Sequence, residues 1–199
     1  MEKRNLIIGI TGGTGCGKTT LLNVIAEQGG LILDCDAIYH TLLQTDRKLL
    51  FDIESRFPDT VENGVLQRKK LGAIVFSDSQ ALEDLNRITH GAVREEVRRR
   101  LETEKPALAA IDAIALFEGN LSQFCNVTVA VTAPVEDRVK RLVKRDNISE
   151  EYARKRIAAQ HQDSWFREKC DCILENNGTE MQFFYKCIAF LKELGIIAM

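Results

Sequence analysis

The sequence predicts an α/β fold, in which helices flank a parallel five-stranded sheet and the chain adds a helical insertion and a helical lid. Three observations predict this fold. Five short apolar runs alternate with segments of helical periodicity, a pattern typical of parallel sheets with crossover helices. The first apolar run breaks directly into a glycine-rich loop. A long helical stretch, from residue 41 to about residue 105, separates the second run from the third, and one crossover does not need that length.

Length and composition limit the classes of protein to consider. The chain has 199 residues, of which 45% are hydrophobic, and this suits one domain with a well-buried core and room for an insertion. We therefore expect residues 1–199 to form a single domain. The formal net charge of −2 provides no electrostatic footprint for nucleic acid.

The sequence also bears on the location of the protein. It shows no signal segment at its start, and no apolar run approaches the roughly 18 residues that a membrane span needs. Its six cysteines contain no C-x-x-C pair and are typical of reduced thiols. We expect a cytoplasmic protein that binds neither nucleic acid nor a membrane, and the sequence leaves the oligomeric state open.

The first apolar run and the loop after it match the phosphate-loop (P-loop) pattern. Gly12, four residues, Gly17, Lys18 and Thr19 fit G-x-x-x-x-G-K-[ST]. In that pattern backbone N–H groups wrap the phosphates, the lysine reaches the β- and γ-phosphates, and the hydroxyl group binds Mg²⁺. Glycines suit the loop because a Cβ would obstruct the close approach of the backbone. A helix from about Lys18 to Ala26 would point the positive end of its dipole at the bound anion.

The loop therefore predicts a P-loop NTPase-type fold that binds a nucleoside triphosphate. The alternative is a chance match in a glycine-rich turn, and the apolar run before the loop and the amphipathic segment after it argue against that. Lys18 is a predicted catalytic residue, and Thr19 is the predicted ligand of Mg²⁺. The predicted ATP contacts in the loop are Gly12, Gly13, Thr14, Gly15, Cys16, Gly17, Lys18, Thr19 and Thr20.

The second apolar run predicts a strand that ends in a carboxylate. Residues 31–34 would deliver Asp34, with Asp36 just after it, to the edge of the sheet where open α/β folds bind ligands. A carboxylate there could take the proton from an acceptor hydroxyl group or orient Mg²⁺ through water. The alternative is a cap for a helix over residues 37–43, and this alternative suits Asp36 better than Asp34.

The helical pattern of residues 41–105 predicts an inserted helical subdomain. Its helical pattern is interrupted by polar residues near 57–59 and 62–64. The segment contains Arg68 and His90. By residue type alone, Arg68 is typical of a surface charge and His90 of a structural histidine.

The third and fourth apolar runs predict two more strands. Residues 106–111 lead into Asp112, and an acid directly after an apolar strand fits the loose pattern of a Walker B carboxylate. Residues 127–132 are rich in β-branched side chains, which favours a strand over a buried helix. Pro134 suits the start of the next helix.

Three arginines lie on one face of that helix. Arg138, Arg141 and Arg145 are three or four residues apart. One interpretation is a solvated cationic face. The other is a set of cations for the equatorial oxygens of a migrating phosphoryl group, for which the planar, always charged guanidinium is suited. Ser149 can cap a further helix over residues 150–160, and we expect residues of about 141–165 to form a lid that excludes water from a bound nucleotide.

The last part of the chain completes the alternating pattern. Residues 170–178 predict a fifth short strand that ends in a polar loop. Thr179 and Gln182 predict a capping box for the last helix, and Gly195 predicts its end.

With these elements placed, the chain resembles the dephospho-coenzyme A kinase family over nearly its whole length. The family's opening Gly-Leu-Thr-Gly-Gly-Ile-Gly-Ser-Gly-Lys-Ser corresponds to residues 9–19, and its Asp-Ala-Asp to residues 34–36. Gly91 and Ile114 stand where the family usually has proline, and Arg138 stands where it usually has glutamine. The other matching segments are residues 68–76 (Arg-x-x-Leu…Val-Phe), 85–90 (Leu-Asn-x-Ile-x-His), 116–118 (Leu-Phe-Glu), 156–160 (Arg-Ile-x-x-Gln) and 171–178 (Asp-x-x-Ile/Leu-x-Asn-x-Gly).

The resemblance implies transfer of the γ-phosphate of ATP to the ribose 3′-hydroxyl group of dephospho-coenzyme A, the last step of coenzyme A biosynthesis, with Mg²⁺ as cofactor. Under this interpretation Asp34 is the base that accepts the hydroxyl proton, and Arg141 and Arg145 neutralise the transferring phosphoryl group. The resemblance also implies that the acceptor is bound by Asp34, Arg68, His90 and Glu118, and that the adenine of ATP lies near Asn176.

The sequence argues against three other functions. Another small-molecule P-loop kinase, acting on a nucleoside, shikimate or gluconate, would have a small acceptor that needs less covering surface than the long insertion offers. A GTPase-type switch would need Asp-x-x-Gly and Asn-Lys-x-Asp motifs, which the sequence lacks. A module that only binds coenzyme A would leave Lys18 and Asp34 unexplained.

Overall fold

The computed structural model describes residues 5–197, and the chain divides into two compact units. The first unit consists of the chain up to Leu33, the segment Pro106–Leu116 and the chain from Ser122 onward. The second unit consists of Asp34–Lys105 and Phe117–Leu121. The sequence predicted one domain whose insertion starts at about residue 41, whereas the second unit starts at Asp34 and includes a second, short segment.

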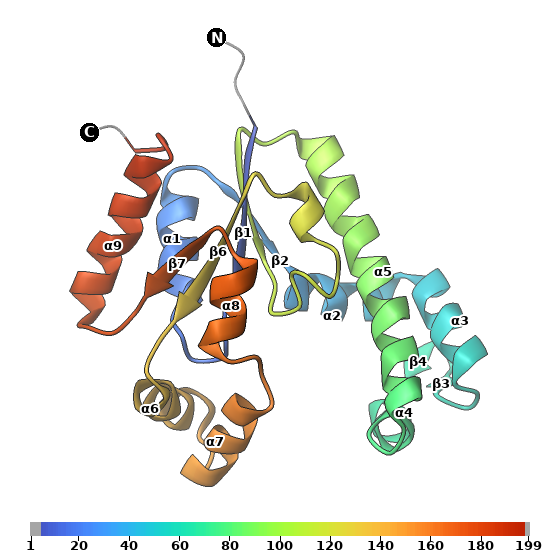
Figure 1. The fold of residues 1–199 in the computed structure, drawn as a ribbon. Helices are drawn as coiled ribbons and strands as arrows, with labels where there is room; N and C mark the ends of the chain where they lie inside the picture. Colours follow the sequence, from blue (N-terminus) through green and yellow to red (C-terminus); the bar gives the residue numbers. More distant parts are fainter. Residues whose placement is uncertain (1–4, 198–199) are drawn as a thin grey trace. The chain divides into compact units, whose positions relative to one another are not determined.

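A five-stranded sheet forms the centre of the first unit (Figure 1). Its strand order is β2-β5-β1-β6-β7, and parallel pairing joins β1 to β5, β1 to β6 and β6 to β7. This sheet confirms the predicted fold class. Because β1 is central, its carboxyl end delivers the glycine-rich loop to the middle of one edge of the sheet. The strands are β1 (Leu6–Thr11), β2 (Leu31–Asp34), β5 (Leu108–Asp112), β6 (Val127–Thr132) and β7 (Cys172–Glu175).

Helices α1 and α9 share the main hydrophobic core of the first unit with the sheet. They pack against each other, and their buried side chains Leu21 and Leu191 join Ile8 and Ile10 of β1 in one cluster. Thr179 and Gln182 form the predicted capping box at the start of α9. The helices are α1 (Lys18–Glu27), α6 (Val135–Asp146), α7 (Glu150–Ala158), α8 (Asp163–Lys169) and α9 (Glu180–Glu193), with a 3₁₀ turn at Ser122–Phe124.

Helices α6 and α7 occupy most of the segment that was predicted to be a lid. Val139 and Leu142 of α6 pack with Ala153 and Ile157 of α7 in a small hydrophobic cluster of their own. Ser149 caps α7 as expected, because its side chain accepts a hydrogen bond from the backbone N–H of Tyr152. The two helices therefore form a compact pair at the end of β6 (Figure 1).

The second unit contains four helices and a hairpin. Its core cluster includes Leu49, Ile53 and Phe57. The polar interruption at residues 62–64 is a tight turn with Asn63 and Gly64 at positive φ, a conformation that joins two short antiparallel strands. The sequence did not predict these strands, because two residues each are too few to show a period. The elements are α2 (Cys35–Thr45), α3 (Arg47–Arg56), β3 (Val61–Glu62), β4 (Val65–Leu66), α4 (Arg68–Val75) and α5 (Ser79–Glu104).

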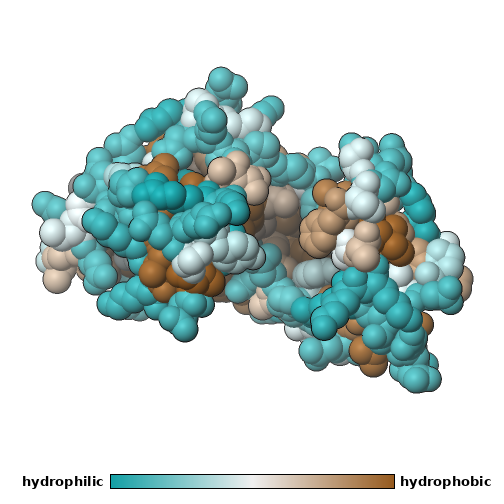
Figure 2. All heavy atoms as spheres, turned by 90° about the horizontal axis from the view of Figure 1, so that it is seen from below, coloured by the Kyte–Doolittle hydropathy of each residue, from teal (hydrophilic) through white to brown (hydrophobic). Residues whose placement is uncertain are grey.

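The surface seen from below is mostly hydrophilic, with hydrophobic residues gathered in small patches (Figure 2). On the second unit the exposed apolar side chains include Phe51, Val65 and Phe76. Among the described residues, every helix is too short or too polar to cross a membrane.

Candidate active site

The backbone of the phosphate loop requires glycine at several positions. Gly12, Gly15 and Gly17 have φ angles of 125°, 77° and 98°, which residues with a Cβ rarely adopt. A Cβ at Gly12 would also collide with the carbonyl oxygen of Val131. The loop is therefore a left-handed, tightly packed turn between β1 and α1.

Lys18 lies at the start of α1 and reaches back across the loop. Its Nζ donates a hydrogen bond to the carbonyl oxygen of Gly12 at 3.1 Å. Thr19, the next residue, is exposed. The ammonium group of Lys18 and the N-terminus of α1 therefore both lie at the phosphate loop. Both are positive, and this suits the binding of an anion.

The carbonyl groups of the loop are bound by side chains from other elements. Arg138 Nε donates to Thr14 O at 2.9 Å, and Arg141 Nη1 donates to Gly15 O at 3.1 Å. The side-chain amide of Asn176 donates to Cys16 O at 2.9 Å. Three consecutive peptide carbonyls are therefore held by donors from α6 and from the end of β7.

Asn176 was predicted near the adenine of ATP. The residue is only 5% exposed, and its backbone N–H donates to Thr132 O of β6. A Cβ at Gly17 would collide with its side-chain amide. Asn176 thus packs directly against the phosphate loop and holds its backbone.

The thiol of Cys16 lies inside the same loop and is buried. Burial raises its pKa above the ordinary value, while the positive charges of Arg138 and Lys18 act in the opposite direction. The thiol is therefore protonated at neutral pH.

The three arginines of α6 do not act as one group. Arg138 and Arg141 bind the loop, whereas the exposed Arg145 makes two hydrogen bonds to Asp146, at 2.6 and 3.0 Å. Asp146 also accepts from Arg156 of α7 at 2.6 Å. Together these two guanidinium groups lower the pKa of Asp146 to about 2.

Asp34 ends β2 and also caps the N-terminus of α2. Its Oδ1 accepts a hydrogen bond from the backbone N–H of Ala37 at 2.9 Å. The sequence had favoured Asp36 over Asp34 for this role, and that preference was wrong, since α2 starts at Cys35 and Asp36 lies in its first turn. The capping bond uses one oxygen of Asp34, and the side chain remains exposed.

The predicted acceptor contacts fall into two groups within the second unit. Arg68, at the start of α4, lies 3.2 Å from His40 Nδ1 on α2. His90 of α5 interacts with Glu118, which belongs to the segment Phe117–Leu121. His90 and Glu118 are therefore neighbours, while Arg68 has a different partner.

Burial of the His90 ring lowers its pKa below the ordinary value of 6.5, the charge of Glu118 opposes this, and Arg94 adds to it. The folded protein thus favours neutral His90. The contribution of this residue to stability is therefore present above pH 6.5 and is lost as the pH falls through the lower pKa of the folded state.

We expect an NMR titration to give a His90 pKa below 6.5. The pKa should be lower still in Glu118→Gln, which removes the opposing negative charge, and higher in Arg94→Met, which removes a positive charge. A higher His90 pKa in Glu118→Gln than in the parent would contradict this electrostatic explanation.

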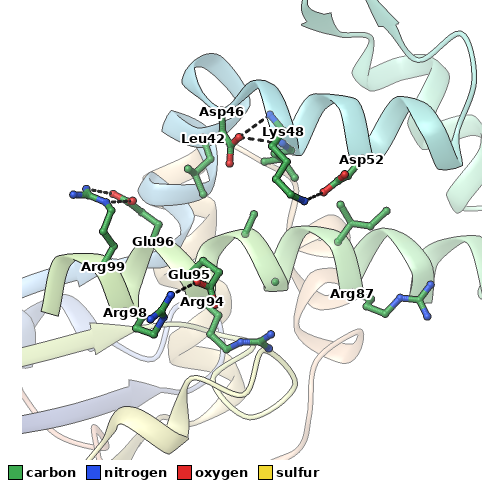
Figure 3. A pocket seen from close by; sticks show the side chains of 14 residues that line it. Leu42, Asp46, Lys48, Asp52, Arg87, Arg94, Glu95, Glu96, Arg98 and Arg99 are labelled. Carbon is green, nitrogen blue, oxygen red and sulfur yellow. Dashed lines mark hydrogen bonds and ion pairs between the residues drawn. The ribbon is translucent and has the colours of Figure 1, made fainter. Parts of the chain in front are cut away.

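A groove of about 530 Å³ lies between α5 and the α2–α3 corner of the second unit (Figure 3). Ion pairs line it, including Lys48 with Asp52 and Arg98 with Glu95. Gly91 also lines it, and a Cβ at that position would have no neighbour within 4 Å. None of the predicted acceptor residues lines this groove, so it is separate from the predicted contacts.

The sequence missed the contact between Arg138 and the loop, although the helical spacing had marked Arg138 as one of three arginines on a face. It also did not predict that Gln160 would bind the loop, yet Gln160 Oε1 accepts from the backbone N–H of Thr14 at 2.8 Å. The sequence held two signals for Arg138, its helical spacing from Arg141 and Arg145 and its departure from the glutamine that is usual at this position in the family that the chain resembles.

Comparison with known proteins gives a consistent result. A family model described as dephospho-CoA kinase matches residues 6–182. The dephospho-CoA kinase of Thermobifida fusca is 33% identical over 192 residues, which are 95% of this chain and 96% of that protein. The crystal structure of TT1252 from Thermus thermophilus has a TM-score of 0.80 and 31% identity, covering 95% of this chain and 97% of that one. A dephospho-CoA kinase from Campylobacter jejuni, at 24% identity and a TM-score of 0.66 over 94% and 96% of the two chains, is similar in fold.

Proposed function

This chain belongs to the dephospho-CoA kinase family, and from that premise we propose how its own residues transfer the γ-phosphate of ATP to the ribose 3′-hydroxyl group of dephospho-coenzyme A. The activity is that of an ATP-dependent kinase, and another small-molecule P-loop kinase is not favoured. The observation that supports the residue roles most directly is the phosphate loop, with its carbonyls held by side chains and Lys18 folded over it.

The triphosphate binds in the loop from Gly12 to Thr20. The backbone N–H groups of the loop and the N-terminus of α1 face the phosphates, and Lys18 exchanges its bond to Gly12 O for the β- and γ-phosphates. This exchange costs little, because a neutral acceptor is replaced by a charged one and charge-assisted hydrogen bonds are stronger.

The carboxylate of Asp34 accepts the proton of the acceptor hydroxyl group. The second oxygen of Asp34 serves as the base while Oδ1 keeps the cap of α2, which holds the side chain in one orientation. Charge that develops on the transferring phosphoryl group is neutralised by Lys18, Arg141 and Arg145. Arg145 must leave Asp146 to do so, and closure of the lid helices would exclude water from the reaction.

Arg68, His90 and Glu118 bind the acceptor. A neutral His90 can both donate and accept hydrogen bonds, which suits the hydroxyl and amide groups of dephospho-coenzyme A. The exposed guanidinium of Arg68 suits the diphosphate of the same molecule.

Mg²⁺ would accompany the triphosphate. Within residues 5–197 no three His, Cys, Asp or Glu side chains cluster as a metal site, so the donor set fits a cation that is held largely by nucleotide phosphates and water. The Thr19 hydroxyl group and Asp112, the last residue of β5 beside β1, would hold it. When bound, Mg²⁺ neutralises charge on the β- and γ-phosphate oxygens.

A cytoplasmic location suits this function. None of the six cysteines, all of which lie within residues 5–197, forms a disulfide, and this is typical of a reducing compartment. The expected partners are the two substrates, ATP and dephospho-coenzyme A, without nucleic acid or a membrane. The net charge of −2 provides no overall attraction for polyanions.

The function is tested by measuring ADP release with Mg²⁺ and ATP across a set of acceptors. We expect release to require dephospho-coenzyme A, and the product to carry a new 3′-phosphate by ³¹P NMR. Nucleosides, shikimate and gluconate are the control acceptors. Release with one of these and not with dephospho-coenzyme A would contradict the proposal.

A further inference from the structure

Arg138 is a charged residue in the interior of the first unit. It lies in α6, and only 4% of its surface is exposed. Its Nε donates to Thr14 O at 2.9 Å, and its Nη2 donates to the side-chain oxygen of Gln160 at 3.1 Å. Both acceptors are neutral, and no ion pair to Arg138 is found among residues 5–197. A buried guanidinium without a carboxylate is costly in the protein alone.

Gln160 closes this arrangement into a ring. The oxygen that accepts from Arg138 also accepts from the backbone N–H of Thr14, at 2.8 Å. The carbonyl and the N–H of Thr14 are therefore both bound, one by Arg138 and the other by Gln160. We call Thr14, Arg138 and Gln160 the Thr14 clamp.

The clamp acts on a glycine-rich part of the phosphate loop. Glycines flank Thr14 on both sides, and glycine loses more conformational freedom on ordering than any other residue. A Cβ at Gly13 would collide with the guanidinium of Arg138, so the arginine packs directly against the backbone. The clamp thus orders the loop before a ligand arrives, and ordering in advance strengthens binding.

We propose that Arg138 is a positioning residue that, with Gln160, fixes the phosphate loop in its binding conformation and offers the triphosphate a buried positive charge. This inference rests on the proposed function only in assigning the loop to ATP. The triphosphate would provide the negative charge that Arg138 lacks within the protein, so the arginine favours the loaded loop over the empty one.

The test measures ATP binding in the full chain without an acceptor. In Arg138→Met we expect the Kd for ATP, measured by calorimetry, to rise about 10- to 100-fold, the size expected for lost bonds from a charged donor. The rise in melting temperature caused by saturating ATP should shrink. Lys144→Gln is the matched control, because it removes one positive charge from the exposed part of the same helix, and it should leave the Kd within about 2-fold.

Gln160→Ala should also raise the Kd for ATP. In the double variant Arg138→Met/Gln160→Ala, the fold-increase in Kd should be smaller than the product of the two single fold-increases, because both residues share the clamp. The KM for dephospho-coenzyme A should be unchanged in each variant. If Arg138→Met does not fold, Arg138→Gln keeps a neutral donor and should show a smaller rise in Kd.

Three results would overturn the proposal: a Kd for ATP within about 2-fold of the parent in Arg138→Met, multiplicative losses in the double variant, or equal increases in the KM of both substrates. Because binding is measured without an acceptor, an error in the assigned acceptor would leave the ATP result intact. A failure of the clamp and a failure of the proposed function are therefore distinguishable.

Discussion

Asp34→Asn is expected to lower kcat by about 10²- to 10⁴-fold, the range for loss of a general base, while the affinity for ATP stays close to that of the parent. The amide of asparagine cannot accept the proton of the acceptor hydroxyl group. It can still accept the hydrogen bond from Ala37 N that caps α2, because asparagine is as good a cap as aspartate. Steady-state ADP release and ATP calorimetry on the same preparation separate the two properties.

Because asparagine keeps the hydrogen bond that caps α2, Asp34→Asn is more informative than a variant that removes this bond. Asp34→Ala would remove the base and also the cap, at a cost of about 1 kcal/mol of stability, so its loss of activity would have two causes. Asp36→Asn is the matched control, since Asp36 lies in the first turn of the same helix and should keep nearly full turnover. Near-normal kcat in Asp34→Asn would remove Asp34 from the base role.

Lys18→Met is expected to reduce kcat/KM by about 10²- to 10³-fold, the size typical of removing one group that stabilises developing charge. Methionine keeps most of the length of the side chain but has no ammonium group for the β- and γ-phosphates. The affinity for ATP should also fall, because Lys18 contacts the loop that holds the phosphates. In Lys18→Ala, kcat/KM should fall by at least as much as in Lys18→Met.

The control for Lys18 has to keep the charge on the same helix turn. Lys18→Arg retains the charge but not the compact, strongly hydrated ammonium group, so we expect turnover to recover only in part. Full turnover in Lys18→Met, measured at saturating ATP and dephospho-coenzyme A, would exclude the lysine from charge stabilisation.

Much of the fold could be read from the sequence, because its signals are local. The strand before the loop, the spacing from Gly12 to Thr19 and the capping box at Thr179 each depend on residues within about ten positions of one another. The hairpin at residues 61–66 was missed because its strands are two residues long. The cap of α2 was assigned to the wrong one of two neighbouring aspartates, since a helix boundary is uncertain by one or two residues.

The sequence by itself determined the α/β class, the phosphate loop and the family, since these depend on patterns of neighbouring residues. Only the tertiary structure decided which arginines of α6 reach that loop and that Asn176 packs beneath it. Arg138 and Thr14 are 124 positions apart, and Asn176 and Cys16 are 160 apart. No periodicity links such distant residues. Their contact follows from the order β1-β6-β7 in the sheet and from the bonds of α6 to the loop, where carbonyl groups must find donors.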